Sequence, residues 1–216
     1  MLIKTSSAEI GKKIAGMLLN IQAIKLNETS PFTWASGWKS PIYCDNRRSL
    51  SYPEVRSYIK IALRDAVKEH FANAEVVAGV ATAGIPQGAL LAEELGLPFI
   101  YVRSKPKGHG MENLIEGELK SGSKVVVVED LISTGGSSIK AANDIRAAGG
   151  DVIGMLAIFT YGFDLSVRNF EVAKIPLVTL SNYSSMLEIA VESEYITEDQ
   201  VTSLSSWRDN PSNWGR

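Results

Sequence analysis

Two adjacent carboxylates, Glu129 and Asp130, stand directly before a turn of small hydroxyl and glycine residues. The turn reads Ser133-Thr134-Gly135-Gly136-Ser137-Ser138, and helical spacing follows it. Backbone N–H groups and hydroxyls at the start of a helix can bind a phosphate, and glycines allow the backbone to approach it closely. Acidic side chains repel phosphate alone, but they suit sugar hydroxyls or a magnesium ion shared with a second phosphate. The pattern therefore predicts a site for a phosphorylated sugar.

This turn has the spacing of neither a P-loop nor a dinucleotide-binding loop. An ordinary strand, polar turn and helix is the alternative interpretation, but buried strands rarely end in two acids. The stretch resembles the phosphoribosyl-pyrophosphate (PRPP) motif of type I phosphoribosyltransferases, in which the carboxylates hold ribose hydroxyls and the turn holds the 5-phosphate. The resemblance assigns PRPP binding to Glu129, Asp130, Leu131, Ile132, Ser133, Thr134, Gly135, Gly136 and Ser137.

A second stretch, Arg103-Ser104-Lys105-Pro106-Lys107-Gly108-His109-Gly110, places four basic side chains within seven residues. No apolar periodicity appears before about Gly122, so we expect a long loop, and loops of this length are usually functional or disordered. A solvated charged loop is the alternative to a mobile flap that stabilises a pyrophosphate leaving group. The pattern R-x-x-x-K-x-H-G resembles the catalytic flap of orotate phosphoribosyltransferases. That resemblance implies that Arg103, Lys107 and His109 bind PRPP and act in catalysis with Asp130, in the active site of the neighbouring subunit of a homodimer.

A third stretch runs from Phe32 to Arg47 and is rich in side chains suited to binding, namely Trp34, Trp38, Lys39, Tyr43 and Arg47. Aromatic and β-branched residues flank Ser36-Gly37, which predicts a hairpin. A surface hairpin with exposed aromatics is the alternative. The run F-T-x-x-S-G-x-K-S-P-x-Y resembles the amino-terminal hood that covers the pyrimidine in orotate phosphoribosyltransferases. The resemblance implies orotate contacts from Ser133, Lys39 and Tyr43.

A shorter turn, Ala81-Thr82-Ala83-Gly84-Ile85-Pro86, resembles the pyrophosphate-binding loop of the same family. One branch of that family has lysines where this chain has Ala35 and Ala83, and an arginine near the position of Tyr161. Another branch resembles this chain at these places. The residue that pairs with the orotate carboxylate is therefore left open, with Ser133 preferred for one contact and Lys39 as a further candidate.

Strands predicted at 75–80, 98–102, 125–128, 152–159 and 175–180 alternate with helices, and four consecutive valines indicate a strand buried on both faces. This order predicts an α/β fold with a mainly parallel central sheet flanked by helices. We expect one domain over residues 1–216, in which residues 1–50 contribute a first helix and the hood. Ser6 and Glu9 predict a capping box for that helix, and Thr197 and Gln200 predict one for the last helix.

Composition limits the classes of function. The chain has 216 residues and a net charge of −2 without a run of like charges, which argues against nucleic acid as a partner. No apolar run is long enough to span a membrane, and the single cysteine, Cys44, excludes an intrachain disulfide. We therefore expect a cytoplasmic protein without a membrane partner, in which Cys44 is a packing residue and not a nucleophile.

Together the three resemblances imply an enzyme that transfers ribose 5-phosphate from PRPP to orotate in pyrimidine biosynthesis. Magnesium is the implied cofactor, held mainly by the pyrophosphate of PRPP and without direct protein ligands. Two alternatives stay open at this point. One is a type I phosphoribosyltransferase that acts on a different base, which would share the central turn but not this hood. The other is a regulatory protein that senses PRPP and binds nucleic acid.

Overall fold

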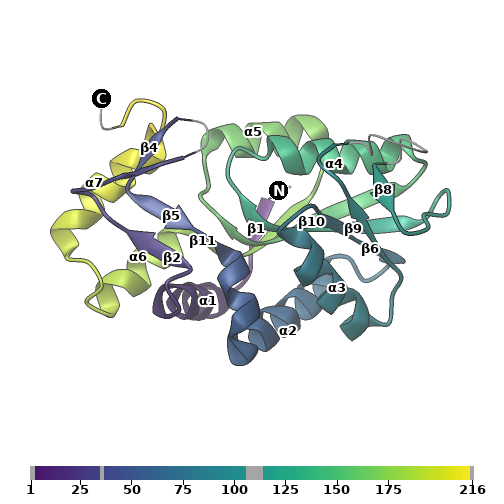
Figure 1. Ribbon diagram of the computed structural model, residues 1–216, viewed down its shortest axis with the longest axis horizontal. Helices are drawn as coiled ribbons and strands as arrows, with labels where there is room; N and C mark the ends of the chain where they lie inside the picture. Colours follow the sequence, from purple (N-terminus) through teal and green to yellow (C-terminus); the bar gives the residue numbers. More distant parts are fainter. Residues whose placement is uncertain (1–2, 35–36, 106–113, 215–216) are drawn as a thin grey trace.

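The computed structural model describes residues 3–34, 37–105 and 114–214. At its centre lies a seven-stranded sheet in the order β1-β11-β10-β9-β6-β7-β8, with helices on both faces (Figure 1). All neighbouring strands are parallel except β7 and β8, which are antiparallel. This confirms the predicted α/β class. The strands are β1 (Ile3–Thr5), β6 (Val76–Val80), β7 (Phe99–Val102), β8 (Ile115–Glu116), β9 (Lys124–Ile132), β10 (Asp151–Thr160) and β11 (Leu177–Asn182).

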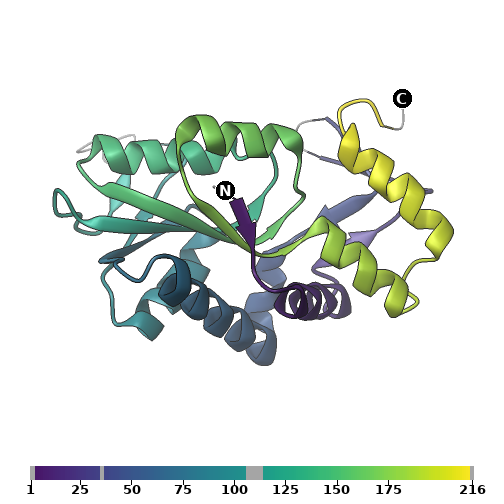
Figure 2. The same ribbon diagram turned by 180° about the vertical axis from the view of Figure 1, so that it is seen from behind.

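Strand β9 explains how the two faces are built. All four of its valines are fully buried, and because side chains alternate along a strand they enter two different cores. Val126 and Val128 belong to the core beneath α1 (Ala8–Asn20), α2 (Pro53–His70) and α3 (Gly84–Leu95). Val125 and Val127 belong to the core beneath α4 (Gly136–Ala147) and α5 (Asp164–Ala173). Figures 1 and 2 show these two helix layers on opposite sides of the sheet.

The segment predicted as a hood forms two small antiparallel sheets at one end of the molecule. Strand β2 (Ile24–Leu26) pairs with β5 (Ile42–Cys44), and β3 (Phe32–Thr33) pairs with β4 (Lys39–Ser40). The second pair confirms the predicted hairpin. Helices α6 (Tyr183–Glu192) and α7 (Glu198–Asp209) lie at the same end (Figures 1 and 2). A 3-10 helix, η1 (Asn46–Ser51), leads from the hood into α2.

Four details differ from the sequence predictions. Helix α1 is capped by Ser7, whose Oγ accepts from the N–H of Ile10, so the predicted capping box of Ser6 and Glu9 is wrong by one residue. Strand β8 interrupts the segment predicted as one continuous loop from 103 to 122; a two-residue strand is too short to show periodicity. Strand β1 was not expected. Strand β9 continues through Ile132, so both carboxylates lie within the strand and not after it.

The predicted capping box of α7 is confirmed, because Thr197 and Gln200 make both of its hydrogen bonds. Among the described residues, no helix is long and apolar enough to cross a membrane.

Candidate active site

The sheet order places a crevice between β9 and β6. From β6 the chain continues through α3 to β7 on one side, and from β9 it continues through α4 to β10 on the other side. Ligands of open α/β sheets bind outside the carboxyl ends of the strands at such a switch point. Here the turns at 81–83 and 133–135 follow β6 and β9, which are neighbouring parallel strands of the sheet. Gly84 begins α3 so close to β9 that a Cβ at this position would collide with the backbone oxygen of Val128.

The turn after β9 has the backbone shape of an anion-binding site. Gly135 caps α4 with φ of 81°, a conformation that favours glycine, and a Cβ there would also lie 2.7 Å from the ring of Phe170. Asn169 on α5 fixes the turn by donating a 2.9 Å hydrogen bond from Nδ2 to the backbone oxygen of Thr134. The first N–H groups of a helix have no partner within the helix and attract anions. The amino end of α4 can therefore receive a phosphate.

The two carboxylates differ in their surroundings. Glu129 is 6% exposed, and its Oε1 accepts from the N–H of Asp130 while its Oε2 accepts from the hydroxyl of Ser138, both at 3.0 Å. Burial and then the charge of Asp130 raise the pKa of Glu129 well above its ordinary value. Burial also raises the pKa of Asp130, although its hydrogen bond with Glu129 and the charge of Arg47 oppose this. Both acids have lost hydration, so a ligand that donates hydroxyl groups would satisfy them.

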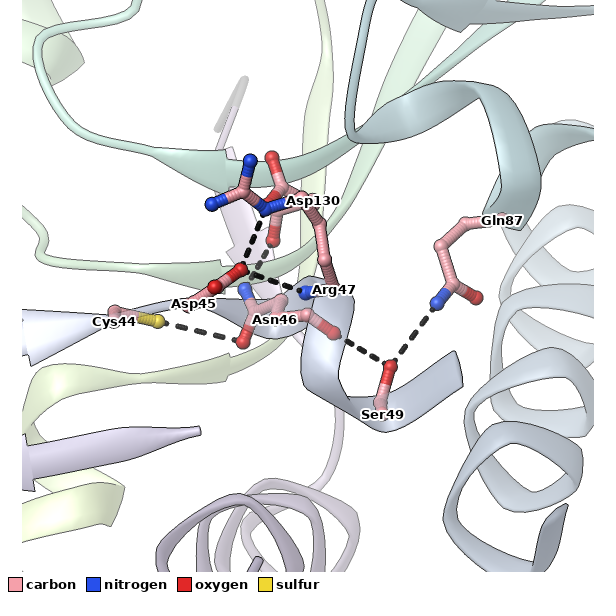
Figure 3. A network of polar contacts seen from close by, with 7 residues as sticks. All are labelled: Cys44, Asp45, Asn46, Arg47, Ser49, Gln87 and Asp130. Atoms are coloured by element: carbon pink, nitrogen blue, oxygen red, sulfur yellow. Dashed lines mark hydrogen bonds and ion pairs between the residues drawn. The ribbon is translucent and has the colours of Figure 1, made fainter. Parts of the chain in front are cut away.

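A polar network ties the Asp130 backbone to two other elements (Figure 3). Asn46 donates a 2.7 Å hydrogen bond from Nδ2 to the backbone oxygen of Asp130. The backbone oxygen of Asn46 accepts from the Ser49 hydroxyl at 2.6 Å, and Gln87 on α3 donates to the same hydroxyl at 3.2 Å. Asn46, Ser49 and Gln87 are all buried. The network therefore links η1, next to the hood, with β9 and with the helix that follows the turn at 81–83.

A pocket of about 260 Å³ lies between the hood and the turn after β9. Two of its aromatic walls, Trp34 and Tyr161, stack with ring centroids 5.1 Å apart. A flat heterocycle can pack against an aromatic wall of this kind because aromatic rings stack favourably. The pocket is lined by Thr33, Trp34, Tyr43, Cys44, Leu131, Ser133 and Tyr161.

The residues expected to bind a base are only partly brought together. Ser133 and Tyr43 line the pocket, whereas Lys39 is not among its lining residues. Lys39 instead donates a 2.8 Å hydrogen bond from Nζ to Oγ1 of Thr33, which does line it. Cys44, a free thiol on the pocket wall, is half-buried. Burial and then the charges of Asp130 and Asp45 raise its thiol pKa well above the ordinary value, which agrees with packing and not with nucleophilic chemistry.

Of the three flap residues expected to act in catalysis, Arg103 is described, and Lys107 and His109 lie outside the described residues. Arg103 follows β7 and makes an ion pair with Glu116 on β8, with Nη1 and Oε1 3.3 Å apart. Its N–H also donates to the backbone oxygen of Leu114 at 2.8 Å. The two ends of the segment are thus held together next to the sheet.

Three residues at the site were missed or undervalued by sequence reasoning. Asn46 was not singled out, because its role depends on Asp130, 84 positions away. Tyr161 was noted only as a point of departure between family branches, and Trp34 only as a side chain suited to binding. The aromatic run from Phe32 to Tyr43 was the one local signal available, and it indicates a binding surface without showing which ring faces the ligand.

Comparisons with known proteins agree with this geometry. Residues 50–182 match the model of the phosphoribosyl transferase domain. The chain is 57% identical to an orotate phosphoribosyltransferase of Porphyromonas gingivalis, covering 95% of this chain and 98% of the relative. It is 58% identical to that of Phocaeicola vulgatus, covering 94% and 96%.

Among solved structures, an orotate phosphoribosyltransferase from Aeropyrum pernix aligns with a TM-score of 0.73 and 30% identity, covering 85% of this chain and 99% of that one. Sequence, fold and site geometry therefore lead to one conclusion. The chain belongs to the orotate phosphoribosyltransferase family of type I phosphoribosyltransferases.

Proposed function

We propose that the chain carries out its family's reaction, in which PRPP and orotate give orotidine 5′-monophosphate and pyrophosphate for pyrimidine biosynthesis. The observation that carries this proposal is the shared pocket of hood and phosphate turn. Thr33, Trp34 and Tyr43 come from the hood, and Ser133 comes from the turn. A base in this pocket would lie next to a sugar phosphate bound at the turn, as a transfer between them requires.

The residues then take separate roles. The amino end of α4 and the hydroxyls of Ser133, Thr134 and Ser137 hold the 5-phosphate. Glu129 and Asp130 accept hydrogen bonds from the ribose hydroxyls. Positive charge develops on the ribose as its bond to pyrophosphate breaks, and adjacent carboxylates stabilise that charge. The aromatic wall of Trp34 and Tyr161 packs against the pyrimidine ring and keeps its nitrogen within reach of the ribose.

Magnesium fits this site as a partner of the substrate. Asp130 and Glu129 offer the oxygen atoms that magnesium prefers. Across the described parts of the chain, no group of three or more His, Cys, Asp or Glu side chains could hold a metal ion. We assign most of the ion's ligands to PRPP itself. When bound, magnesium would supply positive charge that neutralises the pyrophosphate.

The basic segment would stabilise the leaving pyrophosphate from a neighbouring subunit. Arg103, Lys107 and His109 supply cations that the turn at 81–83 lacks, and we propose that they act across a homodimer. Replacing Lys107 by Ala should lower kcat about a hundredfold, the usual effect of losing one preorganised charge contact. An unchanged kcat would remove the segment from the mechanism.

Mixing two inactive variants tests the action across the dimer. Dimers that combine Lys107→Ala and Asp130→Asn chains contain one site with both residues intact, so they should regain part of the activity. Homogeneous dimers of each variant serve as controls. Verified mixed dimers without recovered activity would count against action across subunits.

A panel of bases tests the choice of substrate. Orotate should compete for the base site, and uracil and hypoxanthine should not. Competition by hypoxanthine alone would indicate a different base-specific phosphoribosyltransferase. PRPP binding without turnover of any base would indicate a regulatory protein that senses PRPP.

A further inference from the structure

The base pocket has no cationic residue among those that line it. Orotate carries a carboxylate, and PRPP carries several phosphate groups, so the proposed function places negative charge at this end of the site. An anion that loses water on binding needs donors or a counter-charge. A cation just outside the pocket wall would meet this need with both charge and donors.

Arg47 on η1 is placed to supply it. Its Nε is held by Oδ1 of Asp45 at 2.6 Å, and Asp45 also caps η1 by accepting from the N–H of Arg47. Figure 3 shows the guanidinium of Arg47 above Asp45 and beside Asp130. Cys44, a residue of the pocket wall, donates from Sγ to Oδ1 of Asn46 at 3.4 Å, and Asn46 directly precedes Arg47. Arg47 thus lies beside the acid that we assign to the ribose and next in the chain to a residue that is bonded to the pocket wall.

The free part of this guanidinium has the geometry of an anion clamp. Only Nε is used by Asp45, and neither terminal nitrogen has a hydrogen-bond partner among the residues that the structure describes. The Arg47 side chain is 57% exposed, so a ligand can reach it. Two parallel N–H groups on a rigid plane match the paired oxygens of a carboxylate or a phosphate. Asp45 fixes the stem and leaves that pair of donors available.

We propose that Arg47 is a substrate-binding residue whose terminal nitrogens bind an anionic oxygen group, either the carboxylate of the base or a phosphate of PRPP. This inference rests on the proposed function. The carboxylate is the nearer fit, since Arg47 directly follows Asn46, which is bonded to Cys44 on the pocket wall. Lys39, the other hood cation considered for this role, is engaged with Thr33.

The neighbouring Arg48 provides a matched control. It carries the same charge on the same short helix, but its Nε donates to the backbone oxygen of Ile21 at 3.1 Å. Arg48→Gln removes one positive charge from the same short helix, at a side chain that bonds to the backbone of Ile21 and to which we assign no ligand contact. Arg47→Lys keeps the charge of Arg47 and removes the paired donors.

Calorimetric titration of the two glutamine variants with three ligands tests the proposal. Orotidine 5′-monophosphate and uridine 5′-monophosphate differ only in the carboxylate, and PRPP lacks the base. If Arg47 binds the carboxylate, Arg47→Gln should weaken the binding of orotidine 5′-monophosphate about ten- to a hundredfold. The affinity for uridine 5′-monophosphate should stay unchanged. If Arg47 binds a phosphate, the affinity for PRPP should fall instead. If that phosphate is the 5-phosphate, the affinities for both nucleotides should fall as well. Arg47→Lys should recover only part of the affinity.

The proposal is overturned if Arg47→Gln changes no affinity by more than twofold, or if Arg48→Gln changes the same affinities equally. Thermal unfolding of both variants checks that each is folded at the temperature of the titration. A wild-type protein that binds neither nucleotide and does not consume orotate would instead show that the proposed function is wrong.

Discussion

Asn46 donates its side-chain N–H to the backbone oxygen of Asp130 across 2.7 Å, and it is 1% exposed. This bond joins the segment after the hood to the strand that carries the two acids. Asn46 is itself held through Ser49, which bonds to Gln87 on α3. The position of Asp130 therefore depends on three elements that are separate in the sequence.

Replacing Asn46 by Ala should disturb both stability and catalysis. The backbone oxygen of Asp130 loses its donor, which costs about 1–3 kcal/mol in the free energy of unfolding. A displaced Asp130 should also lower kcat about tenfold or more, because transfer depends on exact positioning. Urea unfolding and steady-state rates measure the two effects. Asn213→Ala, which removes an exposed amide bonded to Asn210, is the control and should change neither. A loss of stability with an unchanged kcat would limit Asn46 to a structural role.

Trp207 on α7 should affect the base pocket without touching it. It is fully buried, and its ring contacts Trp34 and Tyr161 at centroid distances of 5.6 and 5.5 Å. Trp207→Leu removes this support, so the KM for orotate should rise about three- to tenfold, in line with ~0.5–1.5 kcal/mol for an aromatic contact. The KM for PRPP should stay constant, and Trp207→Phe should retain most of the orotate affinity.

Leu204→Ala is the matched control for that prediction. Leu204 is fully buried on the same helix, and truncating it should lower the free energy of unfolding by about 2–5 kcal/mol. No ring contact of the pocket wall is lost, so both KM values should stay constant at temperatures where the variant is folded. An equal rise in the orotate KM for Leu204→Ala would mean that general loosening, and not the aromatic contact, controls the pocket.

Glu129 should make the stability of the free protein depend on pH. Burial raises its pKa in the folded state, so the folded protein holds this proton more tightly than the unfolded chain does. Its contribution is fully present below the ordinary value of 4.5 and is lost as pH rises toward the folded pKa. Glu129→Gln removes that loss, because an amide does not titrate. Without ligands, the Tm difference between variant and wild type should therefore become more positive from pH 4.5 upward. A difference that stays constant over this range would contradict the assigned pKa shift.

Much of the framework could be predicted because its signals are local. Four consecutive valines identify a doubly buried strand, since a strand buried on both faces needs apolar side chains at every position. Thr197 and Gln200 are three positions apart, so their capping box is visible in the sequence. For α1, either of the adjacent serines at positions 6 and 7 could cap the helix, and in the structure Ser7 does so.

The rest of the site depends on contacts between distant positions. Asn46 matters because its side chain bonds to the backbone of Asp130, and Trp207 matters because its ring packs against Tyr161. No local periodicity encodes such pairs. Lys39 was a further candidate for an orotate contact, after Ser133, but in the β3–β4 pair its side chain bonds to Thr33. Whether it contacts substrate stays a prediction.

The most direct test of the account is the ultraviolet absorbance of orotate in the presence of purified protein, PRPP and magnesium. We expect the absorbance to fall only when all three are present, and orotidine 5′-monophosphate and pyrophosphate to appear in equal amounts. A constant absorbance, together with calorimetric binding of PRPP, would contradict the assignment of orotate as the base while leaving the phosphate turn in place.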